Sequence, residues 1–190
     1  MGIDEEHPVD PISYYGISKQ TPEQYLKVFK DLYGLDYTIL RYANAYGVRQ
    51  DPKGEGGVIS IFVDKFLQGE KPVIFGDGEQ TRDFVYVDDI ARANLLAIEE
   101  GSGEIINISC NVQTSVNQLV ETMKDLVDSS VEAEYQDARE GDIRDSYLNN
   151  SKAKDILSWK PQYDLKSGLK ETFNYYRELY LAEEEIAVGE

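Results

Sequence analysis

The chain has 190 residues, 41% hydrophobic and 29% charged, and its net charge of −17 argues against partners such as nucleic acid or anionic lipid. No run of 18 apolar residues occurs, so we expect no membrane span, and the acidic start lacks the basic and apolar regions of a signal peptide. Cys110 is the only cysteine, which excludes an internal disulfide and favours a cytoplasmic protein. With His7 as the only histidine, the sequence also lacks the ligands for a Cys/His metal cluster.

Helical and extended patterns alternate along the chain, which predicts an α/β fold. The first element is a helix from about Tyr15 to Tyr33, closed by Gly34 and expected to kink at Pro22. A buried strand over 37–40 and a polar loop over 44–57 follow. Further helices are predicted over 58–67, 88–98, 115–127, 151–157 and 165 to about 181, and further extended segments over 73–75, 84–87 and 105–108.

Local capping signals set several of these boundaries. Asp88 is the expected N-cap of its helix, and Ser115 with Gln118 has the spacing of a capping box. The segments 76–82 and 132–145 are predicted to be irregular, and residues 181–190 to be a disordered tail.

Three glycine-rich stretches, 54–57, 76–78 and 101–103, invite comparison with a dinucleotide-binding turn. Such a turn follows a strand and opens a helix. The first stretch follows a loop, the second precedes a loop, and the third precedes a strand, so we reject all three.

Tyr15 and Lys19 stand four residues apart, on one face of the predicted helix. A nearby cation favours the phenolate form of a tyrosine, which would make a general base. The spacing alone is weak evidence, because about one such pair is expected by chance in this composition, and an ordinary surface pair is the alternative.

The context of this pair carries more information. The segments that accompany it are Pro11–Lys19, Leu40–Gly47, Gly76–Asp89 and Leu157–Pro161. In this order and spacing they resemble the NAD-dependent epimerase/dehydratase family of extended short-chain dehydrogenase/reductases, with the closest likeness to UDP-glucose 4-epimerases. Tyr14 and Val48 depart from the family pattern, which often has proline at both positions.

The resemblance implies that Tyr15 is the catalytic base and that Lys19 assists it while contacting the ribose of NAD. Tyr42 would also lie near the nicotinamide. In the implied 4-epimerase reaction, the sugar 4-hydroxyl loses its proton to Tyr15 and C4 gives a hydride to NAD, which is a bound cofactor. The resulting 4-keto sugar rotates in the pocket and takes the hydride back on its other face.

The resemblance also implies a sugar-nucleotide site. Arg82 and Arg139 would bind the diphosphate, since the guanidinium fork suits phosphate oxygens, with Asp142 near the ribose. Asn44 would contact the substrate, and Val73 and Phe75 would flank the uracil. The alternatives without a binding role are that the arginines are solvated surface charges, that Asn44 is a turn residue, and that residues 73–75 pack in the core. Arg144 is expected to pair with an acidic neighbour, and Trp159 to be a packing anchor.

Family members begin with a glycine-rich NAD-binding unit that this sequence does not contain. We expect residues 1–57 and 85–111 to belong to a Rossmann-type parallel sheet domain, and 58–84 and 112–180 to a small α/β sugar-nucleotide-binding domain. The chain would be a C-terminal part: a truncation, an internal-start product or half of a split enzyme with a separate N-terminal half. We expect it to be inactive alone, with a homodimer in the complete enzyme. A dehydratase, decarboxylase or reductase, or a non-catalytic binding module, remains the alternative.

Overall fold

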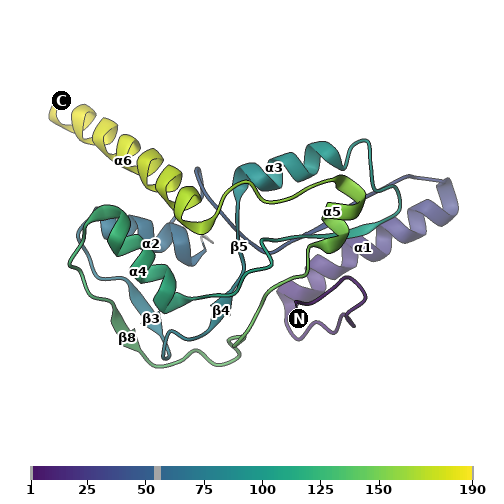
Figure 1. The fold of residues 1–190 in the computed structure, drawn as a ribbon, viewed down its shortest axis with the longest axis horizontal. Coiled ribbons are helices and arrows are strands. Elements are labelled where there is room, and N and C mark those ends of the chain that lie inside the picture. Colours follow the sequence, from purple (N-terminus) through teal and green to yellow (C-terminus); the bar gives the residue numbers. More distant parts are fainter. Residues whose placement is uncertain (1, 54–56, 190) are drawn as a thin grey trace.

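A computed structural model describes residues 2–53 and 57–189, with side chains described up to residue 182. It is a mixed α/β structure in which short paired strands lie between helices (Figure 1). The helices are α1 (Tyr14–Tyr33), α2 (Val58–Leu67), α3 (Val87–Leu96), α4 (Val116–Val127), α5 (Ser151–Leu157) and α6 (Leu165–Gly189). The strands are β1 (Ile39–Tyr42), β2 (Asn44–Tyr46), β3 (Val73–Phe75), β4 (Thr81–Arg82), β5 (Phe84–Tyr86), β6 (Ile105–Ile108), β7 (Thr114–Ser115) and β8 (Glu134–Gln136).

Three of the four strand pairs are parallel: β1 with β6, β2 with β5, and β3 with β8. Only β4 and β7 are antiparallel among the described strands. Strands β1 and β2 follow each other along one extended stretch, so β6 and β5 meet the two halves of that stretch. This parallel arrangement confirms the fold class expected from the alternation of helices and strands.

Several elements match their predicted bounds. Helices α2 and α5 and strands β3 and β6 begin and end where the sequence predicts. Gly34 closes α1 in the left-handed conformation (φ 67°), and its N–H donates to the Lys30 carbonyl. The capping box of α4 is formed, because Ser115 accepts from the Gln118 N–H and Gln118 accepts from the Ser115 N–H.

Other predictions need correction. The first strand covers 39–42 instead of 37–40, because its ladder is set by the position of β6, with Ile39 paired to Ile105. Helix α3 begins at Val87 and has no side-chain cap, so Asp88 is not its N-cap. Asp88 lies in the first turn instead, where its negative charge interacts favourably with the helix dipole. Helix α1 begins at Tyr14 and is continuous through Pro22, and the expected kink at Pro22 stays a prediction.

Four strands lie in segments predicted to be loops or left unassigned: β2, β4, β7 and β8. Each has two or three residues, and β8 is exposed throughout. They form because a partner strand is available, which a local pattern does not reveal.

The C-terminal end differs from expectation in length. The backbone of α6 continues to Gly189, past the end expected near Leu181. Side chains 183–190 lie outside the described part of the structure, and the disordered tail over 181–190 stays a prediction.

Buried apolar side chains form two clusters. One joins α2, α4 and α6 to β3 and β5, and includes Phe62, Met123 and Phe173. The other lies around β6, α3 and α5 and includes Trp159, which is fully buried and donates its indole N–H to the Asp89 carbonyl. Trp159 is thus the packing anchor that we expected. The domain boundaries themselves stay a prediction.

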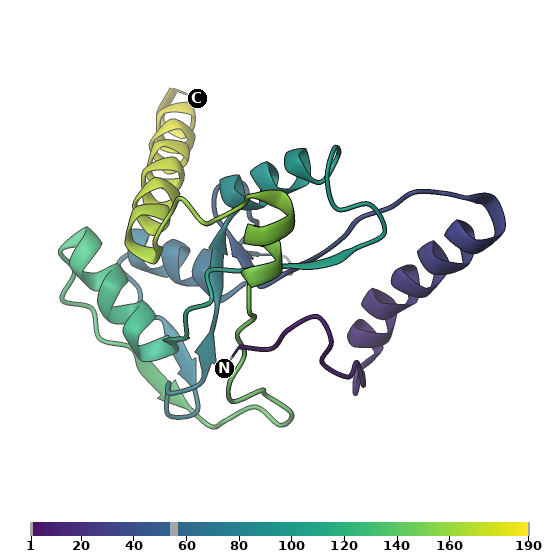
Figure 2. The ribbon, with the colours of Figure 1, turned by 45° about the vertical axis from the view of Figure 1, so that its right-hand side comes forward.

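Helix α1 stands apart from both clusters. Figure 2 shows it projecting from the rest of the molecule. It is described over its whole length and none of its side chains is buried. An ion pair between Glu23 and Arg41 of β1, with contacts of 2.7 and 2.8 Å, ties it to the body.

Candidate functional site

A cavity of about 410 Å³ lies between α2, β3, β4 and the segment after β8. Its size falls in the range of small-molecule sites. All six residues predicted to bind the sugar nucleotide line it: Asn44, Val73, Phe75, Arg82, Arg139 and Asp142. The structure therefore brings together side chains that are up to about a hundred residues apart in the chain.

The polar side of the cavity is built around Arg82 on β4. Its guanidinium donates to the carbonyls of Thr81 and Ile143 at 2.8 and 2.7 Å, and to Asp142 at 2.6 Å. The Arg82 side chain is only 17% exposed. Its donors are thus fixed before a ligand arrives, and Asp142 balances its charge.

Arg139 is held differently. Its guanidinium carbon lies 3.7 Å from the centroid of the Phe75 ring, a cation–π contact. Among the described side chains, none forms an ion pair with Arg139. Its hydrogen-bond donors therefore remain available for an anion such as a phosphate group.

Arg144 behaves as the sequence indicated, because it pairs with an acidic neighbour. Its guanidinium lies 2.7 Å from the Asp77 carboxylate, and both side chains are largely exposed. The ion pair holds the pKa of Asp77 below its ordinary value, with the hydrogen bond from Arg144 as the main cause.

The apolar side of the cavity contains residues that the sequence interpretation did not name. Val58 and Phe62 come from one face of α2, Ile74 from β3, and Val116 from the start of α4. The i,i+4 spacing of Val58 and Phe62 gave a signal for an apolar helix face but not for what that face lines. Apolar walls with a few fixed polar groups are typical of sites for nucleotides and other cofactor-sized molecules.

Gln80 also lines the cavity. Its side-chain amide donates to the Phe75 carbonyl at 2.9 Å and so fixes the loop between β3 and β4. Asn44 stands at the start of β2, and its backbone N–H donates to the Asp83 carbonyl at 2.8 Å. Asn44 and Gln80 thus add side-chain amides to the polar side.

Tyr15 and Lys19 lie outside this cavity, on α1. Ser13 is the N-cap of this helix, and its hydroxyl accepts a hydrogen bond from the Gly16 N–H at 3.1 Å. The Lys19 ammonium lies 5.3 Å from the centroid of the Tyr15 ring, so the two side chains share one face, as the spacing predicts. Tyr15 is 69% exposed.

Tyr42 lies apart from this pair. Its hydroxyl donates to Asn94 of α3 at 2.9 Å, whereas the preceding residue, Arg41, reaches Glu23 of α1. Successive side chains of a strand point to opposite faces, so Tyr42 and α1 lie on different sides of β1. Among the described side chains, no hydrogen bond, ion pair or ring contact joins Tyr42 to Tyr15 or Lys19, and their shared role in binding NAD stays a prediction.

Titratable groups in or beside the two cores are not suited to act as bases. Burial raises the pKa of Tyr86 to about 12 and also raises the pKa of Tyr46. Burial likewise raises the pKa of the Cys110 thiol to about 12. These groups keep their protons at neutral pH.

Within the described residues, no group of three or more His, Cys, Asp or Glu side chains could hold a metal ion. None of the helices that the structure describes is long and apolar enough to cross a membrane.

Comparison with known proteins settles the family. The model of the NAD dependent epimerase/dehydratase family matches residues 2–109. The chain belongs to this family. Its membership confirms the resemblance seen in the sequence, and the family name states the dependence on NAD.

Individual relatives point the same way. The chain is 51% identical over 177 residues to a putative UDP-glucose 4-epimerase of Methanocaldococcus jannaschii, covering 93% of this chain and 57% of the relative. It resembles the solved UDP-glucose 4-epimerase of Thermotoga maritima with UDP-glucose, with a TM-score of 0.93 and 49% identity over 95% of this chain and 58% of that one. A UDP-glucuronic acid 4-epimerase of Bacillus cereus, solved with UDP-glucuronic acid and NAD, gives a TM-score of 0.87 at 30% identity, over 95% of this chain and 57% of that one.

Relatives of other activities are less similar to the chain than the putative UDP-glucose 4-epimerase of Methanocaldococcus jannaschii. A UDP-N-acetyl-alpha-D-glucosaminuronate decarboxylase of Bacillus cytotoxicus is 35% identical over 87% of this chain and 53% of its own length. A human dTDP-D-glucose 4,6-dehydratase is 33% identical over 93% of this chain and 51% of its own length. In all these matches the chain spans between half and three fifths of the relative.

Proposed function

We propose that this chain carries the sugar-nucleotide cavity and the catalytic Tyr–Lys pair of a UDP-glucose 4-epimerase. The observation that carries the proposal is the meeting of six separately predicted residues in one cavity. The alternative assignment of Arg82 as a solvated surface charge is disfavoured, because its side chain is 17% exposed and engaged in three contacts.

The cavity divides into regions that suit the parts of a UDP-sugar. The apolar wall near Val73 and Phe75 suits a planar base. Arg139 and Arg82 suit the diphosphate, and Asp142, which Arg82 holds in place, suits a ribose hydroxyl as a hydrogen-bond acceptor. The side-chain amide of Asn44 suits the hydroxyl groups at the sugar end of the ligand.

In the proposed reaction Tyr15 accepts the proton of the sugar 4-hydroxyl and later returns it, while Lys19 stabilises the phenolate. NAD, when bound, would supply the oxidising and reducing chemistry at C4 of the sugar. The exposed Tyr–Lys face of α1 fits such a role because both side chains are accessible on the same side of the helix. Tyr42 is retained as a proposed contact of the nicotinamide.

A second candidate is a non-catalytic binding module for sugar nucleotides. One observation favours it: Tyr15 and Lys19 lie outside the cavity that the six predicted binding residues line. A module of this kind would bind UDP-glucose without converting it.

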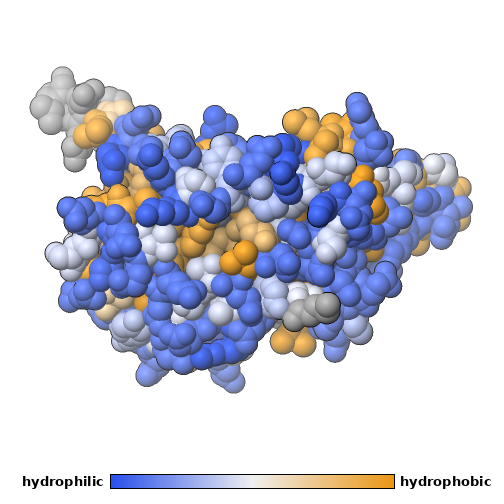
Figure 3. Space-filling view, in the orientation of Figure 1, coloured by the Kyte–Doolittle hydropathy of each residue, from blue (hydrophilic) through white to orange (hydrophobic). Residues whose placement is uncertain are grey.

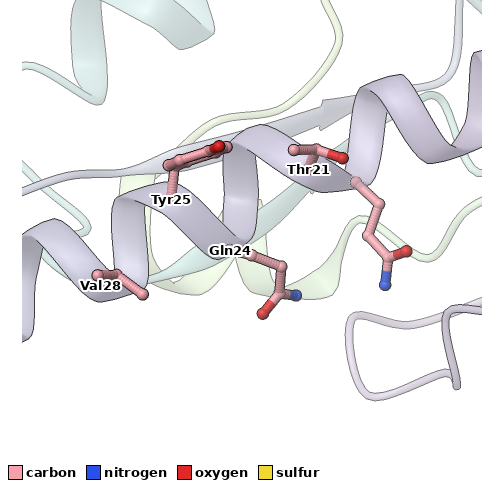
Figure 4. A pocket seen from close by; sticks show the side chains of 5 residues that line it. Thr21, Gln24, Tyr25 and Val28 are labelled. Carbon is pink, nitrogen blue, oxygen red and sulfur yellow. The ribbon is translucent and has the colours of Figure 1, made fainter.

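Surface properties of α1 support the proposed partners. Tyr14, Tyr25 and Leu32 are 94%, 62% and 67% exposed, and Figure 4 shows Tyr25 and Val28 among the α1 side chains that line a shallow depression. We propose that α1 is covered by an N-terminal NAD-binding half and by a second copy of the complete enzyme.

A chimera tests the proposal. The N-terminal part of the Methanocaldococcus jannaschii relative would be joined to this chain, and the product assayed for interconversion of UDP-glucose and UDP-galactose. Activity in the chimera, with none in the chain alone, is expected. Tight UDP-glucose binding by a folded, NAD-loaded chimera without epimerisation would favour the alternative reactions or the binding module.

A further inference from the structure

Asp83 is a buried carboxylate that the proposed reaction does not use. It lies between Arg82 and Phe84, at the junction of β4 and β5, and is 1% exposed. An ionised group in such a place is costly unless every oxygen accepts hydrogen bonds. The hydrogen bonds of the Asp83 carboxylate therefore indicate its structural role.

One oxygen of Asp83 accepts the N–H of Cys110 at 3.0 Å, and the other accepts the N–H groups of Asn111 at 3.0 Å and Leu148 at 3.4 Å. The successive N–H groups of Cys110 and Asn111 thus both point to the carboxylate, and Asn111 itself is in the left-handed conformation (φ 57°). Burial raises the pKa of Asp83, and the three N–H groups oppose that rise.

The backbone of Asp83 holds a further part of the cavity, since its carbonyl accepts the Asn44 N–H at 2.8 Å. The two preceding residues bind the segment that carries Asp142. Thr81 exchanges backbone hydrogen bonds with Arg144 and Ser146, and Arg82 contacts Asp142 and Ile143. Three successive residues, Thr81 to Asp83, thus hold the 142–148 segment against the strand ends.

We infer that Asp83 is a positioning residue of the cavity, which fixes the wall carrying Asn44 relative to the wall carrying Asp142. It touches no ligand itself and acts through the 109–111 turn and the 142–148 segment. The inference rests on the proposed function, because the consequence of the positioning is the affinity for a UDP-sugar.

The chain offers a matched control in Asp89. Its carboxylate is also 1% exposed and also accepts backbone N–H groups, those of Gln162 and Tyr163 at 2.9 to 3.1 Å. Unlike Asp83, it is in addition ion-paired with Arg92. Asp89 does not line the cavity, and it holds the chain around Trp159 instead. Asp89→Asn therefore removes a buried carboxylate, as Asp83→Asn does, but leaves the walls of the cavity unchanged.

The test compares Asp83→Asn with Asp89→Asn in the chain, by calorimetric titration with UDP-glucose and by urea denaturation. An amide can replace one acceptor oxygen, but its NH2 group then faces an N–H donor, so both variants should lose stability. Asp83→Asn should bind UDP-glucose about tenfold more weakly, and Asp89→Asn within twofold of the wild type. In the chimera, Asp83→Asn should raise KM by the same factor with kcat within a few-fold.

Equal affinity of Asp83→Asn and wild type, or an equal loss in both variants, would overturn the inference while leaving the proposed function intact. A wild-type chain that does not bind UDP-glucose would overturn the proposed function and the inference with it. If Asp83→Asn does not fold, hydrogen exchange of the wild type decides. UDP-glucose should slow exchange at Cys110, Asn111 and Leu148 more than at Gln162 and Tyr163, and equal slowing contradicts the inference.

Discussion

Arg82 and Asp142 form an ion pair of 2.6 Å at the polar side of the cavity, although sixty residues separate them in the chain. The pair orients both side chains without a ligand. A diphosphate would meet one arginine that is already fixed, and a second, Arg139, that rests on the Phe75 ring.

Replacing either arginine by alanine should weaken UDP binding by about one to two powers of ten. Hydrogen bonds to charged groups contribute ~1.5–3 kcal/mol, and 1.4 kcal/mol corresponds to a factor of ten. Arg82→Ala should have the larger effect, because it also leaves the Asp142 charge unbalanced beside the phosphates. Arg49→Ala and Arg177→Ala, both at exposed positions, serve as controls in the same titration. Equal affinity of all four variants would contradict the assignment of the cavity.

Tyr15→Phe should lower kcat of the chimera by about 10²- to 10⁴-fold, the usual contribution of a general base. Lys19→Met should also lower kcat and should move the rising limb of the pH profile to higher pH, because the cation no longer favours the phenolate. Steady-state assays between pH 6 and pH 10 measure both effects. Lys27→Met on the same helix is the control, and near-normal turnover of Tyr15→Phe would show that another group is the base.

The chain alone should not bind NAD in a saturable way at micromolar concentration. Gly76 and Gly78 have positive φ (82° and 75°), but the stretch leads into β4 and opens no helix, and the 101–103 stretch leads into β6. The 54–57 stretch lies mainly outside the described residues. Calorimetric titration of the chain with NAD tests this expectation, with the chimera as the positive control.

Much of the fold could be predicted from local signals. The capping pair of Ser115 and Gln118 and the apolar face of α2 are local, so the corresponding bounds are correct. Strand β8 consists of three exposed residues, and it exists because β3 offers an edge for parallel pairing. Local reasoning has no access to such a partner.

The candidate site divides in the same way. Arg82, Arg139 and Asp142 were identified by likeness to a family, and the structure places them together. Neither periodicity nor composition could show that Phe62 and Val116 line the same cavity, because an apolar helix face has the same pattern whether it meets a core or a ligand. The position of Tyr42 beside Asn94 likewise depends on how α3 packs on the strands.

Ser115→Ala should destabilise the chain by about 1 kcal/mol, the usual value of an N-cap hydroxyl, because the Gln118 N–H loses its partner. Thr122→Ala in the middle of the same helix should be neutral or slightly stabilising, since alanine has the higher helix propensity. Urea denaturation followed by the fluorescence of the buried Trp159 measures both changes. Similar losses in the two variants would mean that the cap does not act in solution.

Cys110 should resist alkylation in the folded chain. Burial, together with the charges of Asp83 and Asp89, raises the pKa of its thiol from 9.0 to about 12, so the reactive thiolate is rare at pH 8. Because this pKa is raised in the folded state, its contribution to stability is complete below pH 9 and is lost as the pH rises toward 12. Iodoacetamide labelling at pH 8 should be at least about a hundredfold slower in the folded chain than in urea. Comparable rates would show that the thiol is accessible.

Helix α1 has a consequence for the energetics of association. A helix of this length without a buried face has only marginal stability in water, so its amide protons should exchange far sooner than those of α4, which packs its apolar side into a core. A partner that covers Tyr25 and Val28 would fold the helix and remove apolar surface from water in the same step. Assembly should then show a negative heat capacity change and a large entropic cost of ordering, the signature of folding coupled to binding.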